Sequence, residues 1–217
     1  MTAVMTAIRA RQSRCAALGF WPGPIDGLSG PRTAAAYEAA LAHQKARGMP
    51  FAHPTGITRL HWHWTVGWHV PNATDLKAYH CLIPGEGRPR WPVEPMASRS
   101  HTLNANSGAI GMALCGMVGA NERPFKRGSE PITPAQVHSL AAESARLSRV
   151  FDIPVSRWSM LTHAEIQPTF GIVQRWKWDV TWLPGMEQPG DPITVGDRIR
   201  EMVRRELLAQ GPEGVAA

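Results

Sequence analysis

The sequence predicts an α/β fold from three stretches. Residues 57–65 alternate with the two-residue period of a β-strand. Residues 107–117 (SGAIGMALCGM) are small and apolar, which is typical of a strand buried on both faces. From Thr133 onward, apolar residues recur at helical spacing to about residue 151. With 43% hydrophobic and 18% charged residues, the 217-residue chain has the composition of a globular protein with a sizeable core.

The first residues predict a helical pair followed by a linker. Residues 6–18 set apolar side chains among arginines and alanines, which indicates a short amphipathic helix. After a segment rich in turn formers (residues 19–27), a second helix is predicted from Pro31 to about Arg47, ending at Gly48. Residues 49–56 contain Pro and Gly and are interpreted as a linker.

The next predicted strand carries the first candidate metal ligands. A two-residue period over residues 57–65 places His61 and His63 on one face and Trp62 and Trp64 on the other. A lone histidine in a strand is more often a satisfied polar group than a ligand. Two on one face, flanked by bulky tryptophans, make a metal-binding role as plausible as a structural one.

The remaining elements follow in order. A short helix within residues 68–78 precedes a β-prone run, Ala78–Ile83, and residues 84–87 predict a hairpin turn into a strand near residues 90–93. Thr133-Pro134 begins a helix, with Gln136 completing a capping box. A last helix bears Ile199, Val203 and Leu207, with arginines on its other faces. We expect it to pack on the domain; insertion into an anionic membrane is the alternative. We expect residues 211–217 to be disordered.

The second candidate ligand stretch combines His163 and Glu165 with the later Lys177-Trp178-Asp179. Catalytic zinc takes three protein ligands and keeps a fourth position open. His163, Asp179 and a histidine of the 57–65 strand would complete such a set. The alternative is that these are scattered surface and core polar residues.

Hydrolysis of an amide needs further groups beside the metal. Lys177 would share the face of Asp179 if that segment is extended, and would stabilise the oxyanion. Tyr79 would position the water or relay a proton. Glu165 would orient a ligand histidine or act as a base.

The charge and the cysteines limit the partners. The net charge of +6 and the isoelectric point near 9.8 indicate an anionic partner, and nucleic acid, anionic membranes or bacterial wall polymers would all fit. The sequence lacks a zinc finger, a helix-turn-helix pattern and an aromatic-basic RNA signature, so we expect no nucleic-acid partner. Cys15, Cys81 and Cys115 are widely spaced without a CxxC pair, so we expect free thiols.

Nothing in the sequence predicts a membrane span, because no apolar run approaches ~18 residues. Arg9, Arg11 and Arg14 interrupt the region where a secretory signal peptide needs an unbroken apolar stretch. We therefore expect the protein to be made and first held in the cytoplasm.

Two segments resemble known families. Residues 18–27 (LGFWPGPIDG), followed by Gly30-Pro31-Arg32-Thr33, resemble the core motif of the small helical peptidoglycan-binding domain, although no clear third helix follows Leu41. A helical pair that simply packs on the main domain is the alternative. Residues 57–184 resemble the zinc amidases of the bacteriophage lysozyme and peptidoglycan-recognition-protein family.

The amidase resemblance is carried by several motifs in order: His63-Trp64-Thr65-Val66-Gly67, Tyr79-His80-Cys81-Leu82-Ile83, Ser100-His101 with Asn106–Gly111, Thr133–Gln136, His163–Pro168, and Lys177-Trp178-Asp179. It implies a central mixed β-sheet flanked by helices. It also selects His63 over His61, so that one Zn²⁺ is held by His63, His163 and Asp179. The gap between His163 and Asp179 is longer than usual, so a loop over residues 169–176 is expected to bulge near the cleft.

The site residues expected on these grounds are Tyr79, Lys177 and Glu165 as catalytic groups. Substrate contacts are expected from Trp64, Thr65, His101 and Asn106, with Asn104 as the alternative to Asn106. His61, His69 and His80 are interpreted as structural. The reaction implied by the resemblance is cleavage of the amide between N-acetylmuramic acid and L-alanine in peptidoglycan.

The predicted organisation is a helical module (residues 1–48), a linker (49–56), a zinc amidase domain (57–184) and a C-terminal loop, basic helix and tail (185–217). A wall-binding-like module and an amidase in one basic chain imply a monomeric phage or prophage endolysin. Such a protein is made in the host cytoplasm and acts on the cell wall after release, with the basic helix free to meet an anionic membrane surface. The alternatives are a non-catalytic peptidoglycan-recognition protein, which the intact ligand set argues against, and a host recycling amidase.

Overall fold

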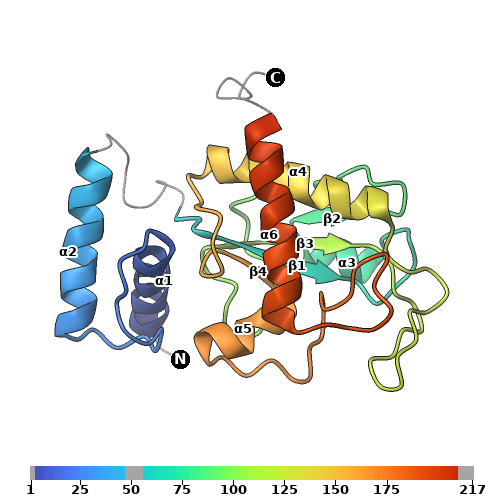
Figure 1. Cartoon of the computed structure of the whole chain (residues 1–217), viewed down its shortest axis with the longest axis horizontal. Helices are drawn as coiled ribbons and strands as arrows, with labels where there is room; N and C mark the ends of the chain where they lie inside the picture. Colours follow the sequence, from blue (N-terminus) through green and yellow to red (C-terminus); the bar gives the residue numbers. More distant parts are fainter. Residues whose placement is uncertain (1–2, 47–55, 210–217) are drawn as a thin grey trace.

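A computed structural model describes residues 3–46 and 56–209, which form a sheet with helices on its faces and a helical pair at one end (Figure 1). Along the chain the elements are α1 (Ala3–Ala17), α2 (Pro31–Ala46), β1 (Arg59–Trp64), α3 (Ala73–Ala78), β2 (Cys81–Ile83), β3 (Ala109–Leu114), α4 (Pro134–Val150), β4 (Met160–Thr162), α5 (His163–Phe170) and α6 (Pro192–Ala209). The predicted linker and C-terminal tail lie outside the described residues, apart from Gly56.

The four strands lie in the order β2-β3-β1-β4, and every pairing between them is parallel. This arrangement confirms the α/β class. The expected hairpin after Ile83 contributes an isolated antiparallel bridge between Leu82 and Arg90 instead of a strand. Pro92 lacks the N–H that a longer ladder would need, which is a physical reason for the short pairing.

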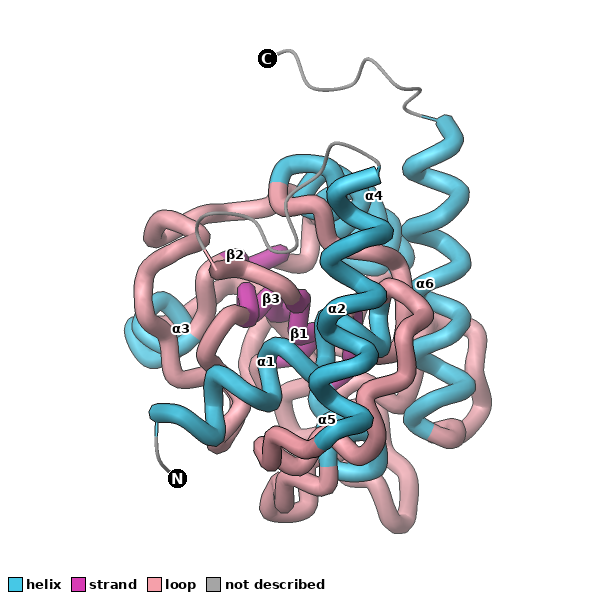
Figure 2. Tube along the Cα trace, turned by 90° about the vertical axis from the view of Figure 1, so that its left-hand side faces the viewer, coloured by secondary structure: helices cyan, strands magenta, loops and turns pink. Residues whose placement is uncertain are grey.

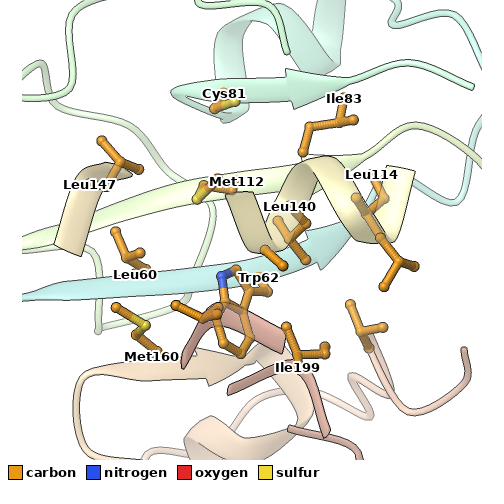
Figure 3. Close-up of a cluster of buried hydrophobic side chains, with 14 of the residues drawn as sticks. Leu60, Trp62, Cys81, Ile83, Met112, Leu114, Leu140, Leu147, Met160 and Ile199 are labelled. Carbon is orange, nitrogen blue, oxygen red and sulfur yellow. The ribbon is translucent and has the colours of Figure 1, made fainter. Parts of the chain in front are cut away.

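One face of the sheet holds the main hydrophobic core (Figure 3). Because side chains alternate along a strand, Leu60, Trp62 and Trp64 of β1 share this face with Ile110, Met112 and Leu114 of β3. The helices α4 and α6 cover it, and α6 supplies Val195, Ile199 and Val203, all fully buried. The expectation that the last helix packs on the domain is confirmed.

The opposite face of the sheet is polar around β1. His61 and His63 point away from the core face, and their parallel partners on β3 are the small residues Gly111 and Ala113. A Cβ atom on Gly111 would lie 2.4 Å from the ring of His101, so only glycine leaves room for that imidazole. Small residues on β3 therefore create the space in which the histidines gather.

The helical pair α1–α2 lies beside one end of the sheet, as the view in Figure 2 shows from that side. The two helices pack through Cys15, Ala36 and Ala40. Gln12 holds the turn between them, because its amide nitrogen donates to Asp26 Oδ1 (3.0 Å) and its oxygen accepts from the Gly27 N–H (2.9 Å). The predicted turn-rich segment is thus a loop tied to α1.

The pair is docked on the rest of the protein by polar and apolar contacts. The buried Arg14 donates to the carbonyl of Asp152 (2.5 Å) and pairs with its carboxylate (2.7 Å). Ile25 packs in a cluster with Ile166 and Phe170 of α5, and the ring of Trp21 lies 5.1 Å from that of Trp158. The module therefore rests directly against the helix that begins at His163.

The three cysteines, Cys15, Cys81 and Cys115, are all buried free thiols, as predicted.

Among the described residues, none of the helices combines the length and the hydrophobicity that a bilayer crossing requires.

Candidate metal centre

Three buried side chains from distant parts of the chain converge at one edge of the sheet. His63 Nδ1 lies 3.0 Å from His163 Nδ1, and Asp179 Oδ2 lies 3.1 Å from each of them. One possible ligand atom from each of the three residues lies within 4.8 Å of the other two. Across a tetrahedral zinc with bonds of about 2.0–2.1 Å, two ligand atoms would be about 3.3 Å apart. The spacing of the three atoms is close to that value.

The sheet register explains why two of these residues meet. Trp62 of β1 pairs with Thr162 of β4. The residues that follow them, His63 and His163, therefore lie side by side at the carboxyl ends of these two strands. This edge is where parallel sheets place their functional groups. Asp179 is held there because its carbonyl accepts the N–H of Ala164 (2.6 Å), one of the free amides in the first turn of α5.

The protonation states of His63 and Asp179 suit metal binding. Burial lowers the pKa of His63 to about 4, although the Asp179 carboxylate opposes the shift. Burial alone would raise the pKa of Asp179, but its contacts with His163 and His63 hold that pKa well below the usual range. Near neutral pH the site therefore offers a neutral imidazole and a carboxylate, the forms in which these groups bind zinc.

The outer nitrogens of His63 and His163 both have polar neighbours. His63 Nε2 lies 3.3 Å from Thr102 Oγ1, and His163 Nε2 lies 2.9 Å from Gln174 Oε1. Such partners orient an imidazole and fix which nitrogen carries the proton. Sequence reasoning missed both residues. Thr102 follows the expected His101 directly, whereas no periodicity or motif marks Gln174.

Tyr79 stands beside the cluster, with its ring centroid 5.2 Å from that of His63. Burial and the nearby charges of Asp179 and Asp75 raise the pKa of its phenol. The hydroxyl therefore keeps its proton at neutral pH and is suited to donate a hydrogen bond. The same property makes Tyr79 a poor acceptor of a proton from water.

Lys177 is exposed and lines a cleft of about 460 Å³ next to His163. Turns at residues 175–176 and 179–180 flank Lys177 in place of the extended strand on which its shared face with Asp179 was predicted. The intervening Trp178 packs edge-on against Trp64, with ring centroids 4.7 Å apart. Lys177 itself is exposed, whereas Asp179 is buried with His63 and His163. The other residues lining the cleft are Ser100, His101, Thr102, Leu103, Asn104, Asn106, His163, Gln174 and Arg175.

His101 and Asn106 both line this cleft but have structural contacts as well. His101 is buried, and its Nδ1 lies 2.9 Å from Thr102 Oγ1. Asn106 uses its side-chain oxygen to accept the backbone N–H groups of His101 (3.1 Å) and Thr102 (2.7 Å). It therefore shapes the segment that carries His101, while the exposed Asn104 lines the same cleft.

The remaining histidines have well-defined structural contacts. His80 accepts the N–H of Gly111 at Nδ1 (2.9 Å), so its Nε2 carries the proton and donates to the carbonyl of Ala97 (2.8 Å). His69 Nε2 is 2.9 Å from the carbonyl of Pro131. His61 Nδ1 lies 3.1 Å from Thr102 Oγ1. None of these three residues has a donor atom in the His63–His163–Asp179 group.

The structure does not bring Glu165, predicted as a base or as the group that orients a ligand histidine, to the His63–His163–Asp179 cluster. Its two carboxylate oxygens bind the fully buried guanidinium of Arg200 at 2.8 and 3.2 Å, and one also accepts the N–H of Thr162 (2.8 Å). These bonds direct the carboxylate toward α6, and the polar neighbour of His163 Nε2 is Gln174. The sequence Thr-x-x-Glu at residues 162–165 is a helix-start pattern, which is the signal that would have identified this role.

Trp64 and Thr65, which were expected to contact the substrate, have structural contacts in the described fold. Trp64 is 2% exposed and belongs to the core, on the face of β1 opposite His63. The hydroxyl of Thr65 accepts the N–H groups of Gly67 and Gly116, both at 3.2 Å, and so closes the turn after β1. Neither residue lines the cleft beside His163.

Comparison with known proteins identifies a family whose model matches most of this chain. A model of the N-acetylmuramoyl-L-alanine amidase family matches residues 30–185, a range that contains all three clustered residues, Tyr79 and Lys177. Solved structures similar to this chain include N-acetylmuramoyl-L-alanine amidase LysC from Clostridium intestinale URNW. The identity is 18%, the match covers 70% of this chain and 89% of that one, and the TM-score is 0.44. A comparison with curated proteins gave no match.

Proposed function

The chain belongs to the N-acetylmuramoyl-L-alanine amidase family and is a hydrolase of the peptidoglycan amide, and we propose that its activity depends on one zinc ion held by His63, His163 and Asp179. The observation that carries the proposal is the convergence of the two Nδ1 atoms and Asp179 Oδ2 at 3.0–3.1 Å. Three buried lone-pair donors at this spacing repel one another unless a proton or a cation lies between them.

Zinc at this position would polarise the scissile carbonyl and lower the pKa of the attacking water. The residues around it divide the remaining tasks. Lys177, exposed in the cleft beside His163, supplies a positive charge for the oxyanion. Tyr79 keeps its proton and donates a hydrogen bond to the water or to the oxyanion. His101, Asn104 and Asn106 line the part of the cleft that faces the substrate.

The zinc proposal is tested by metal content together with mass analysis of a digested cell wall. We expect one zinc per chain and products cleaved between N-acetylmuramic acid and L-alanine. A chelator should abolish this cleavage, and added zinc should restore it. Dye release from labelled walls that a chelator leaves unchanged would rule out the metal-dependent reaction.

For the biological role we propose a monomeric endolysin of a phage or prophage that acts on the intact wall after release from the host cytoplasm. The helical module supports this role. The loop between α1 and α2, together with the start of α2, lines a cavity of about 510 Å³, to which Asp26, Arg32 and Thr33 contribute. Rates on whole sacculi and on soluble muropeptides separate this role from that of a recycling amidase. Faster cleavage of soluble muropeptides would favour the recycling enzyme.

The partner surfaces are proposed on the basis of charge. The apolar face of α6 is buried against the core, so its exposed arginines, Arg198, Arg204 and Arg205, are the charges that this helix offers to an anionic membrane. Arg204 and Arg205 also pair with Glu201, which reduces the positive charge of that surface. We expect weak, salt-sensitive binding to anionic vesicles and no specific binding to nucleic acid. A DNA mobility shift that survives moderate salt would contradict the second expectation.

A further inference from the structure

His63 and His163 differ in whether the partner of the outer nitrogen, Nε2, determines if that nitrogen carries a proton. His63 Nε2 faces the hydroxyl of Thr102 at 3.3 Å. A hydroxyl both donates and accepts, and this one also contacts His61 Nδ1 and His101 Nδ1. Thr102 is therefore compatible with either tautomer of His63. His163 has a different neighbour, the side-chain amide of Gln174, which is 3% exposed.

The orientation of the Gln174 amide follows from its own contacts. Its nitrogen donates to the carbonyl of Leu103 (2.8 Å) and to the carbonyl of Ile172 (3.3 Å). Two carbonyl oxygens on the nitrogen side leave the amide oxygen facing His163 Nε2 at 2.9 Å. An amide oxygen only accepts hydrogen bonds, so the proton of the neutral His163 ring must be on Nε2. Its Nδ1 then carries the lone pair that faces His63 and Asp179.

The backbone of Gln174 is fixed as well. Its N–H donates to the side-chain oxygen of Gln167 in α5 (3.1 Å), and its carbonyl accepts the N–H of Lys177 (2.9 Å). Gln174 thus connects the helix that begins with His163 to the segment that ends with Asp179. It lies in the unusually long stretch between these two ligands.

We propose that Gln174 is a positioning residue that locks His163 in the Nε2–H tautomer and so presents Nδ1 to the metal. This inference rests on the proposed zinc site. It also assigns a role to the loop predicted over residues 169–176, between His163 and Asp179. Gln174 Oε1 in this loop accepts the N–H of His163 Nε2. His63 is left free to change tautomer when the metal binds, because Thr102 accommodates both forms.

The first test needs no metal, and it uses a variant only to assign the signal. In the metal-free protein, ¹⁵N NMR of the imidazole rings distinguishes Nε2–H from Nδ1–H histidines. We expect His163, assigned by its absence from the spectrum of a His163→Ala variant, to be in the Nε2–H form. A His163 that is mainly Nδ1–H would overturn the proposal.

The second test uses Gln174→Leu, which has no acceptor, with Val173→Ala as the control. Val173 is 66% exposed in the same loop. We expect Gln174→Leu to lose the fixed tautomer and to weaken zinc binding about 10–100-fold in a chelator competition, while Val173→Ala leaves both unchanged. Unchanged zinc affinity in a folded Gln174→Leu protein would overturn the proposal.

Two variants keep the test decisive if Gln174→Leu does not fold. Gln174→Glu retains an acceptor toward Nε2 and should retain the Nε2–H form. Gln174→Asn keeps the amide but is too short to span His163 and Leu103, and should weaken zinc binding. If the wild-type protein bound no zinc, the proposed function would fail, whereas the tautomer measured in the metal-free protein would still decide the role of Gln174.

Discussion

Two carboxylates close to the start of α5 are both buried, yet their surroundings differ. Asp179 is 5% exposed and faces two imidazoles, and Glu165 is fully buried against the guanidinium of Arg200. The charge of Glu165 is matched by a permanent positive charge that binds both of its oxygens. Among the described residues, the hydrogen-bond partners of the Asp179 carboxylate are the two histidines, and these can be neutral.

This difference separates a functional carboxylate from a structural one. A buried acid with a bidentate arginine has its acceptors filled and contributes to the positions of the elements it joins, here α5, β4 and α6. A buried acid surrounded by imidazole nitrogens keeps the capacity to bind a cation. Sequence proximity to a histidine does not distinguish them, because Glu165 is nearer to His163 in the chain than Asp179 is.

The strongest test of this comparison exchanges each acid for its amide. Asp179→Asn should lose zinc and reduce turnover by more than the roughly 10²–10³-fold that loss of one oxyanion donor costs. Glu165→Gln should keep zinc in the folded protein. Metal content and wall digestion, measured on both proteins at one temperature, check this pair. Full zinc binding by Asp179→Asn would show that the ligand set is wrong.

The next effect concerns stability. Arg200→Ala leaves the Glu165 carboxylate buried without its partner and should lower the free energy of unfolding by about 3–5 kcal/mol. Denaturant titration measures the loss, and the zinc content of the remaining folded protein should be unchanged. A second variant, Arg200→Met with Glu165→Met, removes both charges and should recover part of the stability. A stability loss below 1 kcal/mol for Arg200→Ala, on the order of an exposed ion pair, would contradict a structural role.

A smaller effect on turnover is expected from Lys177→Ala. This variant should bind zinc normally while kcat falls by about 10²–10³-fold, because a positive charge near the oxyanion is removed. The control is Lys126→Ala, which removes the same charge from an exposed loop position outside the cleft. Equal kcat values for the two variants would remove Lys177 from the mechanism.

The mildest test is the pH dependence of the metal-free protein. His63 has a folded-state pKa of about 4, whereas an unfolded histidine titrates near ~6.5. Between these values the unfolded chain binds the additional proton, so stability should decrease as the pH falls from about 6.5 to about 4. The lowered pKa of Asp179 adds a further loss of stability only below pH ~3.9, which is below this pH range. Urea midpoints at pH 7 and pH 5 with a chelator present provide the measurement. A higher midpoint at pH 5 would contradict it.

The sequence was sufficient where local periodicity determines structure. The alternation in β1 separated His61 and His63 from Trp62 and Trp64, and the Thr133 cap identified the start of α4. The convergence of His63, His163 and Asp179 was expected from a family pattern, and the register of β1 with β4 supplies the physical cause for the two histidines.

Other features depend on contacts that no local pattern encodes. Arg14 and Asp152 are 138 residues apart, so the docking of the helical pair could not be read from either segment. Gln174 lies in a loop without periodicity, and its role exists only because Leu103 and His163 are its neighbours. Glu165 was predicted to be catalytic because a helix-start motif and a catalytic motif share the same residue types.

The pairing of β1 with β3 has a consequence for how the protein acquires activity. A shift of the strand by one residue would exchange the imidazoles and the indoles between the two faces of the sheet. A chain that closed in the shifted alignment would lose both the His63–His163–Asp179 cluster and the apolar core. During refolding, we therefore expect zinc uptake to recover only when this strand has found its correct alignment.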